Sequence, residues 1–274
     1  MDRRNFLKTG GIALLGSLAT GSAMALTTPG ALGGEGADKK AAVALAMNHF
    51  GVSEADLKKV LAAALEKGGD YADLFFEHTI SNSIRLMDGA VNNSYSNIDY
   101  GVGVRVLTGD QSGYAYVENI TVEDMLKAAR TAARIASANK GNKPLNLTEK
   151  ELKKNYYTVA SPWEEVSLKD KMPYLQKLND RIFALDKRVH KVQASQSDTT
   201  SHIFFCNSEG VMFYDYRPMV TLGAVCIMEE DGKTENGYAA RAYRRGFDFL
   251  SDEVVDVIAR EAVDQTSLLF KAIK

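Results

Sequence analysis

The chain contains four histidines and two cysteines, the residue types that most often bind zinc or exchange protons in enzymes. None of the histidines belongs to an H-E-x-x-H motif, which would place two imidazoles on one face of a helix, and no Cys-x-x-Cys pair is present. His49 ends an alanine-rich segment, His78 and His202 lie in strand-like runs, and His190 begins another. We therefore expect ordinary core or surface histidines, and we predict no catalytic residue, metal site or cofactor in this chain.

Other patterns of residues also fall short of known catalytic signatures. Gly101-Val102-Gly103 begins like a dinucleotide-binding fingerprint, but position 106 is valine and no helix is expected after it. The sequence has no Walker loop and no G-x-S-x-G elbow. The acid pair Glu164-Glu165 lies in a loop-like context, where solvated carboxylates are expected.

Three residues are candidates for contact with a peptide or a partner subunit. Arg105 lies among valines in an alternating run, where it either binds a carboxylate or covers apolar surface with its stem while its head stays in water. Asn93 and Tyr95 belong to the run Asn92 to Asn97, which is polar yet compatible with a strand. This run either accepts an added strand from a peptide or a subunit, or forms a solvated loop.

These candidates lie in the stretch Tyr71 to Glu118, around which the rest of the chain is organised. From residue 101 to 106, valine alternates with glycine or arginine, as is typical of a half-buried strand. Asp88-Gly89 and Thr108-Gly109-Asp110 supply residues that tolerate positive φ between such runs. The stretch predicts three or four antiparallel strands joined by hairpins, and such a meander needs helices on one face.

Segments on both sides of this stretch carry helix signals. Ser53 and Asp56 resemble a capping box that opens an apolar helical stripe, and Ser251 opens another near the end of the chain. The last stripe continues to Lys274 without a glycine or proline stop. Because this helix remains apolar at its end, we expect either that a partner chain covers it or that the protein has been cut short.

The second half of the chain follows a similar plan. A helix that begins at either Ser167 or Pro173 precedes five predicted strands, separated by turns such as Arg217-Pro218: Lys191 to Ser197, His202 to Asn207, Val211 to Tyr216, Val220 to Glu229 and Gly237 to Tyr243. We predict an α+β fold of two helix-flanked antiparallel β-meander units that resemble an internal structural repeat. The expected organisation is a leader at 1–25, a linker and short helix at 26–51, a first unit at 52–138, a linker at 139–166 and a second unit at 167–274.

The first 25 residues have the features of an export signal. Arg3-Arg4 precedes an apolar, glycine-rich stretch and the small-residue site Ala23-Met24-Ala25, as is typical of a cleaved twin-arginine signal. The apolar stretch is shorter than the roughly 20 residues of a spanning helix, so we expect a periplasmic protein with no stable membrane anchor after cleavage.

The formal charge is −2, and removing the leader's three basic residues and one acid leaves −4. This charge gives no electrostatic basis for binding nucleic acid.

Both cysteines, Cys206 and Cys226, lie in apolar strand-like runs, where buried thiols are common. In the predicted meander, a third strand separates the two strands that carry them. Two strand spacings are roughly 9 to 10 Å, whereas a disulfide joins Cα atoms no more than roughly 7 Å apart. We therefore expect two free buried thiols.

Four segments give the chain a resemblance to a known family: GDYADLF at 69–75, Asp88-Gly89, NIDYGVGVRV at 97–106 and GYAY at 113–116. On these segments the mature chain resembles the TldD side of the TldD/PmbA family, also called modulators of DNA gyrase. The resemblance implies a zinc-dependent peptidase that acts on small or unfolded peptides as a two-subunit assembly. It also implies zinc ligands in an H-E-x-x-x-H motif of a C-terminal domain, but no histidine here is followed by the required glutamate.

The resemblance and this departure together suggest a role for the chain. We expect the non-catalytic N-terminal portion of a TldD-like zinc metallopeptidase, with zinc held by a missing C-terminal domain. The expected partners are a sister subunit or that zinc domain, together with peptide substrate. The alternative is a stand-alone periplasmic module that binds peptides or acts as a scaffold.

Overall fold

The computed structural model describes residues 39–136, 144–150 and 159–271. The predicted leader at 1–25, the first half of the linker and short helix at 26–51, and parts of the linker at 139–166 lie outside these ranges. The described residues form the α+β fold that the sequence predicts, with five α-helices and one seven-stranded sheet. None of these helices is long and apolar enough to cross a bilayer.

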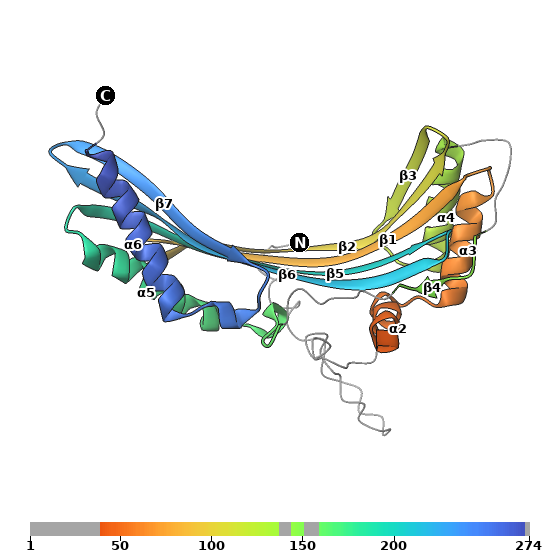
Figure 1. The fold of residues 1–274 in the computed structure, drawn as a ribbon, viewed down its shortest axis with the longest axis horizontal. Coiled ribbons are helices and arrows are strands. Elements are labelled where there is room, and N and C mark those ends of the chain that lie inside the picture. Colours follow the sequence, from red (N-terminus) through yellow and green to blue (C-terminus); the bar gives the residue numbers. More distant parts are fainter. Residues whose placement is uncertain (1–38, 137–143, 151–158, 272–274) are drawn as a thin grey trace, which may run out of the picture.

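The sheet is built on four long central strands that run as one arch from end to end of the molecule (Figure 1). Its order is β3-β2-β1-β5-β6-β4, and β7 also pairs with β6. Every pairing is antiparallel except that of β4 with β6. The strands are β1 (Tyr71–Met87), β2 (Ala90–Thr108), β3 (Gln111–Val117), β4 (Thr148–Glu149), β5 (Val189–Asn207), β6 (Val211–Glu230) and β7 (Lys233–Tyr243).

Two helices begin at capping boxes, and the sequence predicts the first of these. Ser53 and Asp56 form a capping box, and Ser167 and Asp170 form a second one, so the later helix begins before Pro173 and contains it. The helical segments are α2 (Lys39–Phe50), α3 (Glu54–Leu65), α4 (Val122–Ile135), η2 (Trp163–Glu165), α5 (Leu168–Leu185), η3 (Phe247–Phe249) and α6 (Asp252–Leu269).

The final helix ends earlier than the sequence suggests. It stops at Leu269 rather than at Lys274, and the last three residues lie outside the described ranges. Phe270 packs against the neighbouring core, and the guanidinium of Arg188 lies 5.5 Å from the centre of its ring. Leu268 and Leu269 remain exposed.

The described helices all pack on the same face of the sheet, which we call the helix face. In β1, the even-numbered residues from Ala72 to Leu86 point to it, because side chains alternate between faces with a period of two. Figure 1 shows α3 and α4 at one end of the arch, α5 and α6 at the other, and α2 beneath the sheet between them. The odd-numbered residues of β1 point to the opposite, open face.

Two separate hydrophobic cores lie at the ends of the helix face. Phe76 and Phe204 belong to the first core, together with buried residues of α2, α3 and α4. Leu86 and Leu222 belong to the second, together with buried residues of α5 and α6. The open face is rich in hydroxyl groups, and Thr79 donates a hydrogen bond of 2.8 Å to Ser201 across it.

The hairpin turns of the sheet follow the predicted chemistry. Asp88 and Gly89 both adopt positive φ, 50° and 79°, as do Asp231 and Gly232, with 50° and 73°. A two-residue turn with two positive φ angles matches the twist of the strands that it joins. The predicted turns at Asp88-Gly89 and Asp231-Gly232 are therefore confirmed.

The prediction of five shorter strands after the helix near Ser167 is wrong. β5 and β6 each run without interruption through positions where the sequence suggests a break. Pro218, predicted to lie in a turn, is a strand residue opposite Thr200 of β5. At this point neither β4 nor β7 pairs with the outer edge of β6, so the missing N–H of proline costs no ladder hydrogen bond.

The two cysteines are free and buried, as expected, but the geometric reason differs. Their strands, β5 and β6, are neighbours rather than being separated by a third strand. Cys206 lies opposite Met212 and Cys226 lies opposite Val192, at opposite ends of the strand pair. Each thiol belongs to a different core. The distance along the strands therefore keeps them apart.

Candidate functional site

A band of polar and aromatic side chains crosses the middle of the helix face, between the two cores. One row across four adjacent strands consists of Tyr100, His78, His202 and Tyr216, each directly opposite the next. Helical segments add further polar groups above the strands. We call this set the polar belt, and its members are His49, His78, Asn82, Tyr100, Glu164, Lys171, Gln196, Asp198, Thr200, His202, Tyr214 and Tyr216.

Glu164 is the centre of one half of the belt. Its carboxylate accepts hydrogen bonds from His202 Nε2 at 3.1 Å, from the Tyr216 hydroxyl at 3.1 Å and from Thr200 Oγ1 at 3.2 Å. Because a carboxylate only accepts, Nε2 of His202 carries a proton, and Nδ1 of the same ring forms a hydrogen bond of 2.7 Å with the Tyr214 hydroxyl. Glu164 is exposed as a residue, as expected of a loop acid, but its side chain is only 26% exposed because these hydrogen bonds tie its carboxylate to the sheet.

Three of the four histidines form a stack above the sheet. His49 Nε2 and His78 Nδ1 are 2.8 Å apart and share a hydrogen bond. The ring of His49 also lies over His202, with centroids 4.7 Å apart and planes at 26°. Next to it, Phe50 packs against Phe76 in the first core. The end of α2 is therefore attached to the sheet by one polar and one apolar residue.

The environment of the stack shifts the pKa values of its members. Burial, together with the nearby His202 and His78, lowers the pKa of His49 from 6.5 to about 4. Burial and His202 also lower the pKa of His78. Burial tends to raise the pKa of Glu164, but the hydrogen bond from His202 and the other donors outweigh it, so the pKa lies below its usual value. The belt thus favours neutral histidines at His49 and His78 beside an ionised Glu164.

A buried ion pair forms the other half of the belt. Lys171 Nζ lies 2.6 Å from Asp198 Oδ2, and the two side chains are only 4% and 1% exposed. Asn82 and Gln196 donate further hydrogen bonds to the same carboxylate, at 3.0 and 2.9 Å. The ring of Trp163 covers the ammonium group at 5.3 Å. These contacts offset the cost of removing both charges from water and fix α5 and η2 on the sheet.

A zinc metallopeptidase would need a set of converging metal ligands, and the belt does not supply one. Both ring nitrogens of His202 are already engaged with Tyr214 and Glu164. His49 and His78 are nearly stacked, with planes at 29°, and bond to each other. Within the described ranges, no group of three or more His, Cys, Asp or Glu side chains is arranged to hold a metal ion. The belt residues therefore do not fit a zinc site.

The predicted contact residues lie on β2, and the structure does not bring all of them together. Arg105 lies opposite Asp73 of β1, and its guanidinium contacts that carboxylate at 2.5 and 3.0 Å. Asn93 and Tyr95 lie towards the other end of the strand, roughly 33 to 40 Å along it from Arg105 at the usual rise per residue. Both are exposed. Their role in binding a peptide or partner stays a prediction.

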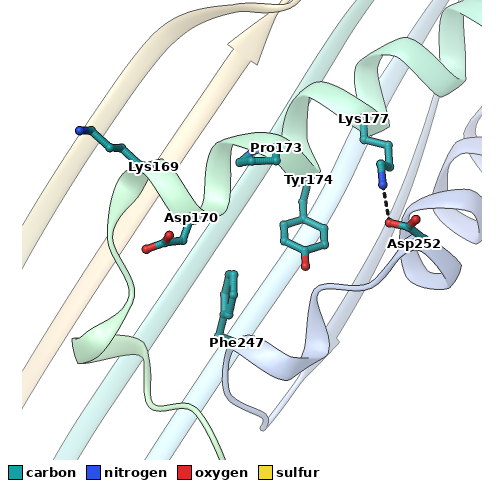
Figure 2. Close-up of a pocket in the computed structure, with 7 residues that line it drawn as sticks. All are labelled: Lys169, Asp170, Pro173, Tyr174, Lys177, Phe247 and Asp252. Carbon is teal, nitrogen blue, oxygen red and sulfur yellow. Dashed lines mark hydrogen bonds and ion pairs between the residues drawn. The ribbon is translucent and has the colours of Figure 1, made fainter.

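Two hollows mark the surface near α5. The larger, of about 380 Å³, lies between α5, η3 and α6 (Figure 2). Both of its acids already have partners, since Asp252 pairs with Lys177 at 2.6 Å and Asp170 caps α5. The smaller, of about 230 Å³, lies where the η2–α5 junction faces β1 and β2, and Ser94, Tyr95 and Lys171 help to line it.

Sequence reasoning missed the belt because its parts come from distant segments. A signal was nevertheless present in β5, where Asp198, Thr200 and His202 occupy alternate positions on the same face as the apolar residue Phe204. Polar residues that continue an inward-facing alternation need partners from elsewhere in the fold. Here the partner for two of them is Glu164, 36 and 38 residues away in sequence.

Comparison with protein families gives two matches. The model described as PmbA/TldA metallopeptidase domain 1 matches residues 72–136. The model described as PmbA/TldA metallopeptidase central domain matches residues 161–270. Together they cover more than half of the chain.

Several curated relatives are metalloproteases. The metalloprotease TldD homolog of Haemophilus influenzae is 31% identical over 214 residues, which cover 74% of this chain and 44% of the relative. The TldD homolog of Buchnera aphidicola from Acyrthosiphon pisum is 26% identical over 207 residues, which cover 76% of this chain and 43% of the relative. The chain thus spans less than half the length of these relatives.

Solved structures share the fold. A protein described as a modulator of DNA gyrase from Thermotoga maritima has a TM-score of 0.63 and 18% identity, over 81% of this chain and 49% of its own. TldE from Thermococcus kodakarensis has a TM-score of 0.57 and 16% identity, over 77% of this chain and 47% of its own. With the family-model matches, these likenesses confirm the resemblance read from the sequence: the chain belongs to the TldD/PmbA metallopeptidase family.

Proposed function

We propose that this chain is the non-catalytic N-terminal portion of a TldD-like zinc metallopeptidase and serves its assembly with a zinc-bearing domain or sister subunit. The observation that carries the proposal is the state of the polar belt. Its histidines and acids are bonded to one another and hold α2, η2 and α5 on the sheet, so they act as structural groups. In support, the matched family models are the first and central domains, and the relatives are more than twice as long as the matched region.

The zinc and the hydrolysis of small or unfolded peptides belong, on this proposal, to the partner. The contribution of this chain is a long arched sheet whose open face carries no described helix (Figure 1). Phe75 lies on that face and is 38% exposed. A sheet face with exposed aromatic residues and hydroxyl groups suits contact with a partner and with extended peptides.

The test is a reconstitution with a zinc-bearing TldD/PmbA subunit from the same organism. The purified chain alone should contain no stoichiometric zinc by mass spectrometry and should not cleave an unfolded protein such as reduced, alkylated α-lactalbumin. It should bind the zinc-bearing subunit and raise its peptidase activity. Stoichiometric zinc in the isolated chain, or no binding to any such subunit, would overturn the proposal.

A matched pair of substitutions tests whether the open face makes this contact. Phe75→Glu places a charge on the open face, and Phe183→Glu places one on α5, where the phenylalanine is 37% exposed. Only Phe75→Glu should weaken binding of the zinc-bearing subunit, by about tenfold or more, because it buries a charge in the interface. Equal effects of the two substitutions would show that the open face is not the contact surface.

We further propose that the protein is exported to the periplasm by the twin-arginine route, on the basis of Arg3-Arg4 and the Ala23-Met24-Ala25 site. Replacing both arginines with lysine should leave the unprocessed chain in the cytoplasm, whereas Thr27→Ser, beyond the site, should not. Intact-mass measurement of the native protein would locate both ends of the mature chain. A native mass that includes the first 25 residues in the periplasmic fraction would contradict cleavage.

The alternative function is a stand-alone periplasmic module that binds peptides or acts as a scaffold. The observation in its favour is the 230 Å³ hollow beside Ser94 and Tyr95, on a strand with an open edge. On this alternative, the isolated chain binds unfolded peptides with no other subunit present. Fluorescence anisotropy with labelled peptides decides between the two functions, since the assembly proposal expects binding only in the presence of the zinc-bearing subunit.

A further inference from the structure

The larger hollow on the surface, between α5, η3 and α6, is separate from the sites considered above (Figure 2). None of the residues that line it belongs to the polar belt or to a strand of the sheet. Its volume of about 380 Å³ lies within the range of roughly 300 to 1,000 Å³ that is usual for sites of small ligands. The residues around it indicate which kind of ligand it can hold.

Aromatic and proline rings form the middle of the hollow. The rings of Tyr174 and Phe247 meet edge to face, with centroids 5.8 Å apart and planes at 86°. Trp163 packs against Phe247 in the same way, at 5.9 Å and 89°, and so fixes its position. Pro173 lies next to Tyr174 on α5 and is exposed (Figure 2). Such a floor suits the apolar or aromatic side chain of a ligand.

A lysine and an aspartate lie at each end of this aromatic middle. At one end, Lys169 has no ion-pair partner within the described ranges, whereas Asp170 is engaged as the cap of α5. At the other end, Asp252 accepts from Lys177 through Oδ1, and its Oδ2 has no donor among the described residues. A free cation at one end and a free carboxylate oxygen at the other complement a ligand with a carboxylate and an ammonium group.

The distance between the two ends sets the length of this ligand. Lys169 and Lys177 are separated by slightly more than two turns of α5, or about 12 Å along its axis. Each residue of an extended peptide advances by about 3.3 Å, so three or four residues cover this distance. A single amino acid is too short to reach both ends. A long unfolded peptide cannot place both of its termini in the hollow.

We propose that the hollow between α5, η3 and α6 binds peptides of three or four residues that have free termini and an apolar or aromatic residue in the middle. The carboxylate of the peptide lies at Lys169, near the N-terminus of α5, whose dipole also favours an anion. The ammonium group lies at Asp252, and the central side chain packs on Tyr174 and Phe247.

The biological meaning of this site rests on the proposed function, because short peptides with free termini are the products of a peptidase that cleaves unfolded chains. The binding itself needs no zinc-bearing subunit and is measured on this chain alone. A failure to bind would therefore leave the proposed assembly standing. A failure of the assembly would likewise leave the binding of short peptides to be measured.

The first test is a titration of the isotopically labelled chain with the tripeptide Gly-Phe-Gly, followed by NMR. Amide signals from the first half of α5 and from η3 should shift, with a dissociation constant below about 1 mM. Three further ligands define what is recognised. Acetyl-Gly-Phe-Gly-amide lacks both charges, Gly-Gly-Gly lacks the ring, and free phenylalanine lacks the length. Each of these should bind about tenfold more weakly or less.

The second test places the carboxylate of the peptide. Lys169→Ala should weaken the binding of Gly-Phe-Gly about threefold, the size of effect expected for an exposed charge pair. The control is Lys187→Ala, which changes another exposed lysine, after the end of α5, and should have no effect. Lys169→Ala should also leave the binding of Gly-Phe-Gly-amide unchanged, since this ligand has no carboxylate. Circular dichroism should confirm that both variants fold.

Three results would overturn the proposal. If Gly-Phe-Gly at about 10 mM shifts no signal of α5 or η3, the hollow does not bind such peptides. Equal binding of the peptide with blocked termini would show that the charged ends do not select the ligand. Equal effects of Lys169→Ala and Lys187→Ala would show that the carboxylate does not lie at Lys169.

Discussion

The two hydrophobic cores and the polar belt lie on the same face of the same four strands, yet different forces hold them. In the cores, Phe76 and Phe204 are fully buried among apolar side chains from three helices. In the belt, one step along the same strands, His78 and His202 are held by hydrogen bonds. Apolar packing should therefore determine the stability of the two ends. Polar pairing and protonation should determine the stability of the middle.

The two ends also share a close contact between a helix and a strand glycine, which the belt lacks. A Cβ added at Gly113 of β3 would meet the carbonyl oxygen of Ala132 on α4, and one added at Gly237 of β7 would lie 2.6 Å from Thr266 Oγ1 on α6. Each glycine thus allows a helix to lie directly against an outer strand. The belt is covered by the end of α2, by η2 and by the start of α5 through polar contacts, so changes of pH act on this part of the helix face.

The largest effect should come from emptying a core. Phe76→Ala should lower the free energy of unfolding by about 3 to 5 kcal/mol, because it removes buried apolar area and leaves a cavity. The adjacent Phe75 points to the open face and is 38% exposed, so Phe75→Ala should cost less than about 1 kcal/mol. Urea denaturation measures both. Similar losses would contradict the assignment of the two residues to opposite faces.

In the belt, removing one member of the buried ion pair should cost nearly as much. Lys171→Ala leaves the carboxylate of Asp198, 1% exposed, without its cation, and should lower stability by about 3 kcal/mol. The double variant Lys171→Met with Asp198→Asn removes both charges and keeps the volume, so it should be closer to the unmodified protein. Thermal and urea unfolding of the single and double variants test this. A double variant less stable than Lys171→Ala would show that the pair itself is strongly favourable.

The contrast between ends and belt also explains which parts of the fold the sequence predicts. Alternation of valines and the Asp-Gly turns locate β1 to β3, because these signals depend on neighbouring residues only. Capping residues such as Ser53 and Ser251 locate helix starts for the same reason. Local chemistry is sufficient at the ends of the molecule, where each helix packs on a strand close to it in sequence.

Prediction from the sequence fails where polar residues occupy the middle of a strand. Asp198 and Thr200 suggest a break in β5, yet the strand continues because Lys171 and Glu164 supply their partners. Pro218 suggests a turn in β6, yet the open outer edge accepts it. These partners are fixed only by the three-dimensional arrangement, so no window of sequence reveals them. For the same reason, the sequence alone does not reveal the belt as a candidate site.

A smaller effect should follow a change of pH at the belt. His49 and His78 have lowered pKa values when α2 is docked, His49 near 4 against 6.5 when free. Above pH 6.5 both states are neutral and docking is complete. As the pH falls from 6.5 towards 4, only the undocked histidines take up protons, so docking of α2 weakens. Glu164, whose pKa is also lowered by donors on the sheet, weakens instead the attachment of η2 when the pH falls below 4.5.

Hydrogen exchange of the α2 amides, corrected for intrinsic rates, should therefore accelerate between pH 7.5 and pH 5. His49→Gln removes a group that titrates and should reduce this acceleration. His190→Gln changes an exposed histidine on β5, outside the belt, and should not. Protection of α2 that is independent of pH in the unmodified protein would show that the histidine stack does not control docking.

The smallest effect should come from the open face, at the pair of Arg105 and Asp73. Their contact joins β2 to β1 at 2.5 Å, but the arginine side chain is 48% exposed, so solvent screens the attraction. The pKa of Arg105 is raised by the hydrogen bond and charge of Asp73, which means that the pair persists throughout the neutral range. Arg105→Gln should cost about 1 kcal/mol in urea denaturation, because solvent already weakens the pair and the glutamine amide can still donate to Asp73, which is 4% exposed. A loss as large as that of Lys171→Ala would remove the distinction drawn between the two faces, since a half-exposed pair would then stabilise the fold as much as a buried one.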